Sequence, residues 1–126
     1  MEALMSGSGG FLTTHVLDTA RGLPASEVMI ELFQMGDDAR RVKIASATTN
    51  DDGRTDAPIL PQDRFSTGTF ELVFHVGAYL RRNNFDVEAP LFLDEIPIRF
   101  GINDATSHYH VPLLISPFGY STYRGS

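Results

Sequence analysis

Apolar and β-branched residues gather in short stretches that recur along the whole chain. Each stretch spans seven or eight residues, the usual length of a β-strand, and the stretches cover residues 11–18, 27–34, 42–49, 69–76, 96–102 and 109–116. Turn-forming Gly, Pro, Asn and Asp stand between several of them, in the segments ARGLPA, GDDAR, NDDGR and PFGYS. This alternation of strands and turns predicts an all-β sandwich or barrel.

One segment departs from the strand pattern. Residues 76–85, VGAYLRRNNF, are long enough for about two to three helical turns. The segment ends in asparagines, which are suited to the C-cap of a helix. We therefore expect a single short helix in an otherwise β-structured domain.

The first and last predicted strands do not divide into an apolar face and a polar face. Successive side chains of a strand point to opposite sides, and in residues 11–18 each side receives both apolar and polar groups. Residues 109–116 show the same mixture, with His110 and Leu114 on one side. Only one face of each sheet meets the core of a two-layer sandwich, so apolar groups on the other face favour cover by another subunit. We expect a homo-oligomer.

Composition narrows the class of protein. The 126 residues fit one domain, to which we assign residues 10–126, with residues 1–9 as a flexible N-terminal tail. The net charge of −6 disfavours a nucleic-acid partner, and no apolar run is long enough for a membrane span. The first residues lack the basic start and apolar core of a signal peptide, which predicts a cytoplasmic protein. Cysteine is absent, which excludes disulfides and cysteine nucleophiles.

Two histidines are candidates for proton transfer. His15 and His110 each lie on a mixed face of a predicted strand, so their imidazoles could share one cleft. Histidine titrates near neutral pH, so one ring could take a proton from water and the other could return one to a leaving nitrogen. The alternative for each is a hydrogen-bonded or solvated residue without a chemical role. His75 and His108 are interpreted as structural.

Arg54 follows the turn NDDG and is a candidate for ligand binding. A guanidinium group can fork onto a planar, oxygen-rich or anionic ligand. The alternative is surface pairing with Asp51, Asp52 or Asp56. The loop lacks the alternating oxygen ligands and distal Glu of a calcium site, and the chain has no H-E-x-x-H pattern. We expect no metal site.

The C-terminal residues are unusual for a chain end. Termini usually fray, yet GYSTYRGS carries two tyrosines and an arginine up to the last residues. This composition favours an ordered strand that ends in a polar site. None of Ser116, Ser121 and Ser126 stands in a G-x-S-x-G elbow, so a serine triad is not expected.

Three segments, THVLDTARGLPA, TNDDGRTD and YHVPLLISPFGYSTYRGS, resemble those of the 5-hydroxyisourate hydrolases in the transthyretin-like family. The resemblance runs from Phe11 to the end of the chain, and the terminal YRGS is its most specific part. It implies a transthyretin-like sandwich of two four-stranded sheets with one short helix, assembled as a homotetramer, a dimer of dimers. It also implies a site at the interface between dimers, built from His15, Arg54, His110 and residues 123–126.

The activity that the resemblance implies is hydrolytic opening of the lactam ring of 5-hydroxyisourate, on the route from urate to allantoin, without a cofactor or a metal. His110, slightly favoured over His15, would polarise the attacking water, and Arg54 would bind the substrate and stabilise oxyanion charge. His15 would position the substrate or protonate nitrogen, and Tyr123 would stack on or hydrogen-bond the planar ring. Arg124 and Ser126, with the terminal carboxylate, would orient the histidines or line the wall, and Ser126 is counted with His15, Arg54 and His110 among the catalytic residues.

Two other functions are compatible with this fold. A transthyretin-like carrier would hold an apolar ligand in the channel between subunits without catalysis. In our alignment that carrier has Lys, Glu and Thr in place of His15, Arg54 and His110, which argues against it. A purely structural sandwich domain of a larger protein has no evident use for the terminal YRGS.

Overall fold

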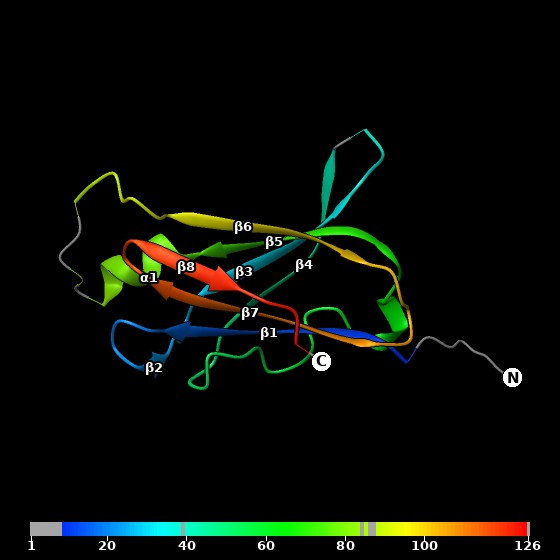
Figure 1. Cartoon of the computed structure of the whole chain (residues 1–126), viewed down its shortest axis with the longest axis horizontal. Helices are drawn as coiled ribbons and strands as arrows, with labels where there is room; N and C mark the ends of the chain where they lie inside the picture. The colour runs from blue at the N-terminus through cyan, green and yellow to red at the C-terminus, as the bar shows by residue number, and fades with distance from the viewer. Residues whose placement is uncertain (1–8, 39, 84, 86–87, 126) are drawn as a thin grey trace, which may run out of the picture.

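Two four-stranded sheets pack face to face in the computed structural model, which describes residues 9–38, 40–83, 85 and 88–125 (Figure 1). The strand order is β2–β1–β7–β8 in the first sheet and β4–β3–β5–β6 in the second. The two-sheet, all-β sandwich expected from the sequence is thereby confirmed. The assigned N-terminal tail lies outside the described residues except for Gly9, so that boundary stays a prediction.

The first sheet carries most of the candidate residues. Strand β1 runs parallel to β7, whereas β2 and β8 pair antiparallel with β1 and β7 respectively. The parallel pairing brings the start of the chain against a strand close to its end. The strands of this sheet are β1 (Phe11–Asp18), β2 (Leu23–Pro24), β7 (His108–Ser116) and β8 (Gly119–Thr122).

The second sheet is antiparallel throughout and has a charged outer face. On that face Arg41 pairs with Glu71 at 2.8 Å, and His75 Nε2 lies 2.7 Å from Glu31 Oε1. His75 therefore makes a contact on the outer face of this sheet, in agreement with its interpretation as a structural residue. The strands are β3 (Met29–Met35), β4 (Arg41–Thr48), β5 (Gly68–His75) and β6 (Glu95–Ile102), and a short 3₁₀ helix (Gln62–Arg64) precedes β5.

The hydrophobic core lies between the two sheets. Leu12 and Val16 of β1 are fully buried there, as are Leu32 of β3 and Phe74 of β5. Burial of one such side chain contributes about 1.5–3 kcal/mol to folding. Because β1 alternates strictly between buried and half-buried positions, the core holds its even-numbered side chains and leaves the odd-numbered ones on the outer face.

Helix α1 (Val76–Arg82) follows β5 directly and closes one end of the sandwich (Figure 1). It is shorter than the predicted segment because Asn83 caps it: the backbone N–H and the side-chain amide of Asn83 both donate to the Tyr79 carbonyl, at 3.1 and 2.9 Å. The Tyr79 hydroxyl donates to Asp18 at 2.7 Å. Burial, followed by the nearby Asp18 carboxylate, raises the pKa of Tyr79 to about 12. The helix is thus fastened to the end of β1.

Each of the six predicted stretches contains an observed strand, and the bounds differ by no more than two residues. Two further strands complete the sheets. Strand β8 lies in the C-terminal segment that the sequence analysis expected to be ordered, while β2 has only two residues and is too short to leave a periodic pattern.

Candidate active site

The register of β1 and β7 brings both candidate histidines onto the outer face of the first sheet. Thr13 stands opposite His110, and His15 stands opposite Pro112. Thr13, His15 and His110 occupy half-buried positions, pointing away from the core. The ring centroids of His15 and His110 are 6.5 Å apart, so a small planar molecule could contact both rings.

Arg54 reaches this face because of a tight turn at residues 50–54. The Asn50 side chain accepts hydrogen bonds from the Asp52 and Arg54 N–H groups, at 2.8 and 3.3 Å. Gly53 has a φ of +78°, and a Cβ at this position would also collide with the Val16 carbonyl oxygen. Its own carbonyl oxygen accepts a hydrogen bond from Val16 N–H at 2.8 Å. The glycine therefore docks the turn on β1 and places Arg54 beside His15.

The same turn fixes the tautomer of His15. His15 Nε2 lies 2.8 Å from the Asp52 carbonyl oxygen. A carbonyl oxygen can only accept a hydrogen bond, so His15 Nε2 must carry the proton. In neutral His15 the unprotonated ring atom is therefore Nδ1, and this atom is the one left for chemistry.

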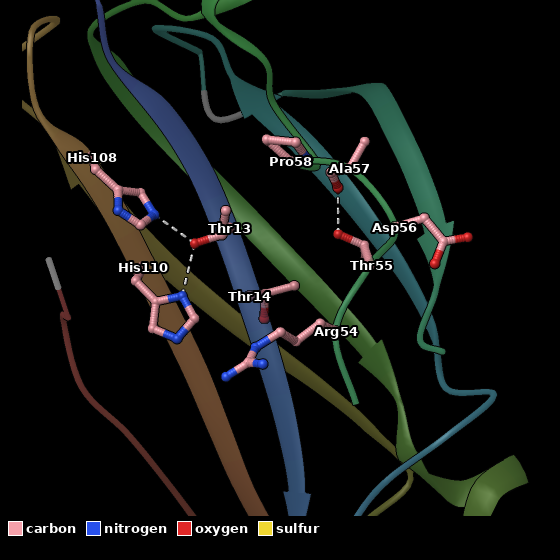
Figure 2. Close-up of a pocket in the computed structure, with 9 residues that line it drawn as sticks. All are labelled: Thr13, Thr14, Arg54, Thr55, Asp56, Ala57, Pro58, His108 and His110. Atoms are coloured by element: carbon pink, nitrogen blue, oxygen red, sulfur yellow. Dashed lines mark hydrogen bonds between the residues drawn. The ribbon is translucent and has the colours of Figure 1, made fainter. Parts of the chain in front are cut away.

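His110 is held through Nδ1, whereas His15 is held through Nε2. The hydroxyl oxygen of Thr13 lies 2.7 Å from His110 Nδ1 and also 2.7 Å from His108 Nε2, as the dashed lines in Figure 2 mark. Since Nδ1 is engaged with Thr13, Nε2 is the atom of His110 that is open to a substrate or a water molecule. The two candidate histidines thus present different ring atoms.

Thr13, His108 and His110 border one pocket of about 360 Å³, a size typical of small-molecule sites, and His15 lies beside it rather than among its lining residues. Arg54 reaches across β1 toward His110 on one wall, and residues 55–58 form the other (Figure 2). Within the described part of the chain, no carboxylate pairs with the Arg54 guanidinium. The nearby Asp56 instead accepts a hydrogen bond from the Asn50 amide at 3.0 Å. The positive charge of Arg54 is therefore available to a ligand.

The pocket lowers the pKa of His110 below its ordinary value of 6.5. Burial is the largest cause, because it removes water from the charged form of the ring. Repulsion from His108, His15 and Arg54 acts in the same direction. The neutral form of His110, which can accept a proton, is consequently favoured.

The C-terminal segment lies directly against His110. The Gly125 N–H donates to the His110 carbonyl at 2.6 Å, and the His110 N–H donates to the Gly125 carbonyl at 3.3 Å. A Cβ at Gly125 would lie 3.1 Å from His110 Cδ2, so the glycine allows the tail backbone to pack closely on the ring. The end of the chain runs beside β7, as expected of an ordered terminus (Figure 1).

The structure does not bring Tyr123 and Arg124 into the same pocket. The Arg124 guanidinium lies 4.2 Å from the ring centroid of Tyr109, and both Tyr123 and Arg124 line a separate hollow with Ile98 and Phe100 of β6. Tyr123 is 59% exposed. Ser126 lies outside the described residues. Of the described tail residues, Gly125 is the one whose backbone bonds to His110.

Two residues of the pocket were missed by the sequence analysis. His108, interpreted there as structural, stands two positions from His110 on the same strand and so shares its face. Thr13 bonds to both rings. The signal was the H-x-H spacing of His108 and His110, which in a strand places two imidazoles side by side.

Neither a metal cluster nor a membrane span is found in the part of the chain that the structure describes. Among those residues, no three histidine or carboxylate side chains are grouped as metal ligands would be. No described helix is long and apolar enough to cross a membrane.

The chain belongs to the HIUase/Transthyretin family, whose model matches residues 12–125. The 5-hydroxyisourate hydrolase 2 of Rhizobium meliloti (strain 1021) is 57% identical over 122 residues, which cover 97% of this chain and 100% of that relative. The 5-hydroxyisourate hydrolase of Mesorhizobium japonicum is 52% identical over 126 residues and is matched over the full length of both chains. The family resemblance inferred from the sequence motifs is confirmed.

Solved structures agree with this assignment. A crystal structure of (S)-allantoin synthase superposes with a TM-score of 0.89 at 42% identity, and the match covers 96% of this chain but only 45% of that one. Sea bream transthyretin in complex with thyroxine superposes with a TM-score of 0.81 at 25% identity, over 90% of this chain and 93% of the other. The sandwich is therefore transthyretin-like.

Proposed function

We propose that the protein hydrolyses 5-hydroxyisourate, opening its lactam ring to give 2-oxo-4-hydroxy-4-carboxy-5-ureidoimidazoline in the degradation of urate to allantoin. The observation that carries the proposal is the pocket that Arg54 and His110 line together, with the His15 ring 6.5 Å from the His110 ring. Among the described residues no carboxylate pairs with Arg54, and the pKa of His110 is lowered, which favours its neutral form. The identity of the substrate is inferred from relatives named 5-hydroxyisourate hydrolase, which match 97–100% of this chain at 52–57% identity.

In the first step, water attacks the lactam carbonyl carbon. His110 Nε2 takes a proton from the water as the new C–O bond forms, while Arg54 stabilises the negative charge that develops on the carbonyl oxygen. The C–N bond then breaks, and the ring nitrogen takes up a proton in place of the one removed from water. The net change is the addition of one water molecule. The reaction needs neither a metal nor a cofactor.

His15 has a supporting role in this scheme. Its Nε2 proton is committed to the Asp52 carbonyl, so its Nδ1 faces the chemistry. From there neutral His15 positions the substrate by accepting a hydrogen bond. To deliver a proton to the leaving nitrogen, His15 would have to carry protons on both ring nitrogens, with the second one on Nδ1.

A transthyretin-like carrier is the competing function, since the sandwich is shared with a thyroxine-binding protein. The test is to mix the protein with freshly generated 5-hydroxyisourate and to follow the ultraviolet decay of the substrate. Decay well above the uncatalysed rate supports the hydrolase. Decay at the uncatalysed rate, together with stoichiometric ligand binding, supports the carrier.

We further propose a homotetramer, a dimer of dimers, with the pocket at the interface between dimers. The exposed Tyr120 and Tyr123 and the half-buried Leu17 and Leu114 would be covered there. In such an assembly the side chains of Tyr123 and Arg124, and Ser126, could contact substrate held by a neighbouring subunit. Light scattering that found a fully active monomer would contradict this arrangement. The cytoplasm is the compartment we propose.

The pH dependence of kcat/KM follows from the lowered pKa of His110. A general base must be neutral, so activity is full above the pKa of His110 and is lost as the pH falls through it. We expect the midpoint of the acid limb to lie below pH 6.5, the ordinary value for histidine. Rates measured in a buffer series, compared with an NMR titration of His110, test this. A limb above pH 6.5 would mean that another group controls the rate.

Deletion of Tyr123 to Ser126 should abolish turnover while the fold survives. The deletion removes the two backbone hydrogen bonds between Gly125 and His110, worth about 0.5–1.5 kcal/mol each, but no residue of the buried core. Activity and the thermal midpoint are to be measured on the same sample. Loss of cooperative unfolding would show that the tail is structural.

A further inference from the structure

We propose that Thr13 and His108 are positioning residues, which hold His110 in the tautomer whose Nε2 is free to accept a proton. The inference rests on the proposed function, because it assigns a reason for the basicity of one atom of that site. It adds two residues to the mechanism, and neither of them touches the reacting atoms in the proposed scheme. The geometry involved is one hydroxyl shared by two imidazoles (Figure 2).

The constraint comes from counting protons. The Thr13 hydroxyl has a single hydrogen, yet it lies 2.7 Å from a ring nitrogen of His108 and 2.7 Å from one of His110. It can therefore donate to at most one ring and must accept from at least one. The tautomers of the two histidines are linked through this hydroxyl.

If Thr13 accepts from both rings, His110 Nε2 is unprotonated, but the Thr13 hydrogen bonds to neither ring. The two arrangements in which Thr13 does donate to a ring differ in what they leave at His110 Nε2. If Thr13 donates to His108, then His110 Nδ1 carries the proton and donates to Thr13, so Nε2 is unprotonated and basic. If Thr13 donates to His110, then Nε2 carries the proton and the ring cannot act as a base. Of these two, only the first survives proton uptake, since the Nδ1–H bond to Thr13 stays in place when Nε2 becomes protonated.

His108 is held where it can accept this hydrogen bond. Its ring stacks on Phe11 with the centroids 4.1 Å apart and the planes inclined by only 11°. Phe11 and Thr13 are both odd-numbered residues of β1, so one strand carries both contacts. His108 is therefore oriented by the sheet itself rather than by the substrate.

The hydrogen bond of Thr13 ends on a neutral imidazole, that of His108, and not on a carboxylate. This difference affects the pKa of His110. Many histidine bases are oriented by a carboxylate, which favours the protonated ring and raises its pKa. Among the described residues, the charged or titratable groups that act on the His110 ring are His108, His15 and Arg54, and all of them oppose its protonation. The hydrogen bond from Thr13 to His108 fixes the tautomer without a carboxylate, so the neutral form of His110 remains favoured.

The tautomers can be read directly by long-range ¹H–¹⁵N NMR of protein labelled at histidine, at a pH where the rings are neutral. Protonated and unprotonated ring nitrogens resonate far apart, and variants of single histidines assign the signals. We expect His110 to be protonated at Nδ1 and His108 to be unprotonated at Nε2. In Thr13→Val the acceptor is lost, and we expect His110 to change to the Nε2-protonated form, whereas Thr13→Ser should keep the native form.

Kinetics provide a second, matched comparison at His108. His108→Phe preserves an aromatic ring for stacking on Phe11 but cannot accept from Thr13, so we expect kcat to fall about 10- to 100-fold, less than the loss of the base itself. His108→Gln places an amide oxygen near the position of Nε2 and should recover most of that loss. The control is His75→Gln, on the second sheet, which should leave kcat unchanged.

Two results would overturn the proposal: an Nε2-protonated His110 in the unaltered protein, or an unchanged His110 tautomer and kcat in both Thr13→Val and His108→Phe. If Thr13→Val fails to fold, His108→Phe with its Gln counterpart decides the question. The NMR spectra are recorded without substrate, so they do not depend on the proposed reaction. A native tautomer that depends on Thr13, in a protein that does not hydrolyse 5-hydroxyisourate, would therefore refute the proposed function and leave the positioning intact.

Discussion

Replacement of His110 by Asn is expected to lower kcat/KM for 5-hydroxyisourate by about 10²- to 10⁴-fold, the usual contribution of a general base. Asparagine is a sharp probe at this position. Its amide can take the place of Nδ1 and keep the hydrogen bond to Thr13, but it has no atom at the position of Nε2. The ultraviolet decay of the substrate measures the loss.

The fold should tolerate this replacement, because His110 is half-buried on the outer face and is not part of the core. An unchanged thermal midpoint would show that the loss is chemical. His75→Asn is a matched control, since His75 bonds to Glu31 on the other sheet and should retain full activity. If His110→Asn were as active as the unaltered protein, His110 would not be the base, and His15 Nδ1 would be the remaining candidate.

Replacement of Arg54 by Met should lower kcat by about 10²- to 10³-fold, the usual cost of removing a group that stabilises an oxyanion. Methionine keeps much of the length of the side chain and removes the charge. Because Arg54 also repels a proton on His110, the pKa of His110 should rise and the acid limb of the pH profile should move upward with it. Steady-state kinetics over a range of pH measure both effects.

Two further variants sharpen this test. Arg54→Lys keeps the charge but loses the planar fork, so it should lie between Met and Arg in activity. Arg40→Met removes a surface arginine that pairs with Asp38, and it should have no effect on kcat. A higher KM with an unchanged kcat in Arg54→Met would mean that Arg54 binds the substrate equally in the ground state and the transition state.

The likeness to transthyretin illustrates that this sandwich does not define a function by itself. The core places the odd-numbered side chains of β1 and the even-numbered ones of β7 on the outer face, whatever those side chains are. In this chain the positions carry Thr13, His15, His108 and His110. The chemistry therefore depends on a few outward-facing residues that can change without disturbing the core.

The strands were predictable because their signal is local. Runs of Val, Ile, Phe and Thr between turn residues identified six of the eight strands, and a lone helix-compatible segment identified α1. The helix ends at Arg82 and Asn83 caps it, as the asparagines near the end of that segment indicated. The two missing strands are short, and their pairing depends on neighbours that are distant in sequence or across a turn.

The site was predictable only in part. His15, Arg54 and His110 were selected as single residues and joined by a family resemblance, since nothing in their spacing reveals that a parallel β1–β7 pair brings the histidines together. His108 was set aside, although its spacing from His110 placed it on the same face. Thr13 gave no signal at all, because its importance lies in two hydrogen bonds to residues more than 90 positions away.

The sequence by itself determined the class of fold, the family and the three polar residues on which the proposed reaction depends. These are matters of local pattern, which a strand or a motif carries within a few residues. The tertiary structure alone decided which ring atoms of His15 and His110 are open and how Thr13 links His110 to His108. It also decided that the side chains of Tyr123 and Arg124 line a different hollow. The proton positions on the rings and the residues that line each hollow depend on distances between segments far apart in the chain. A local sequence pattern does not reveal those distances.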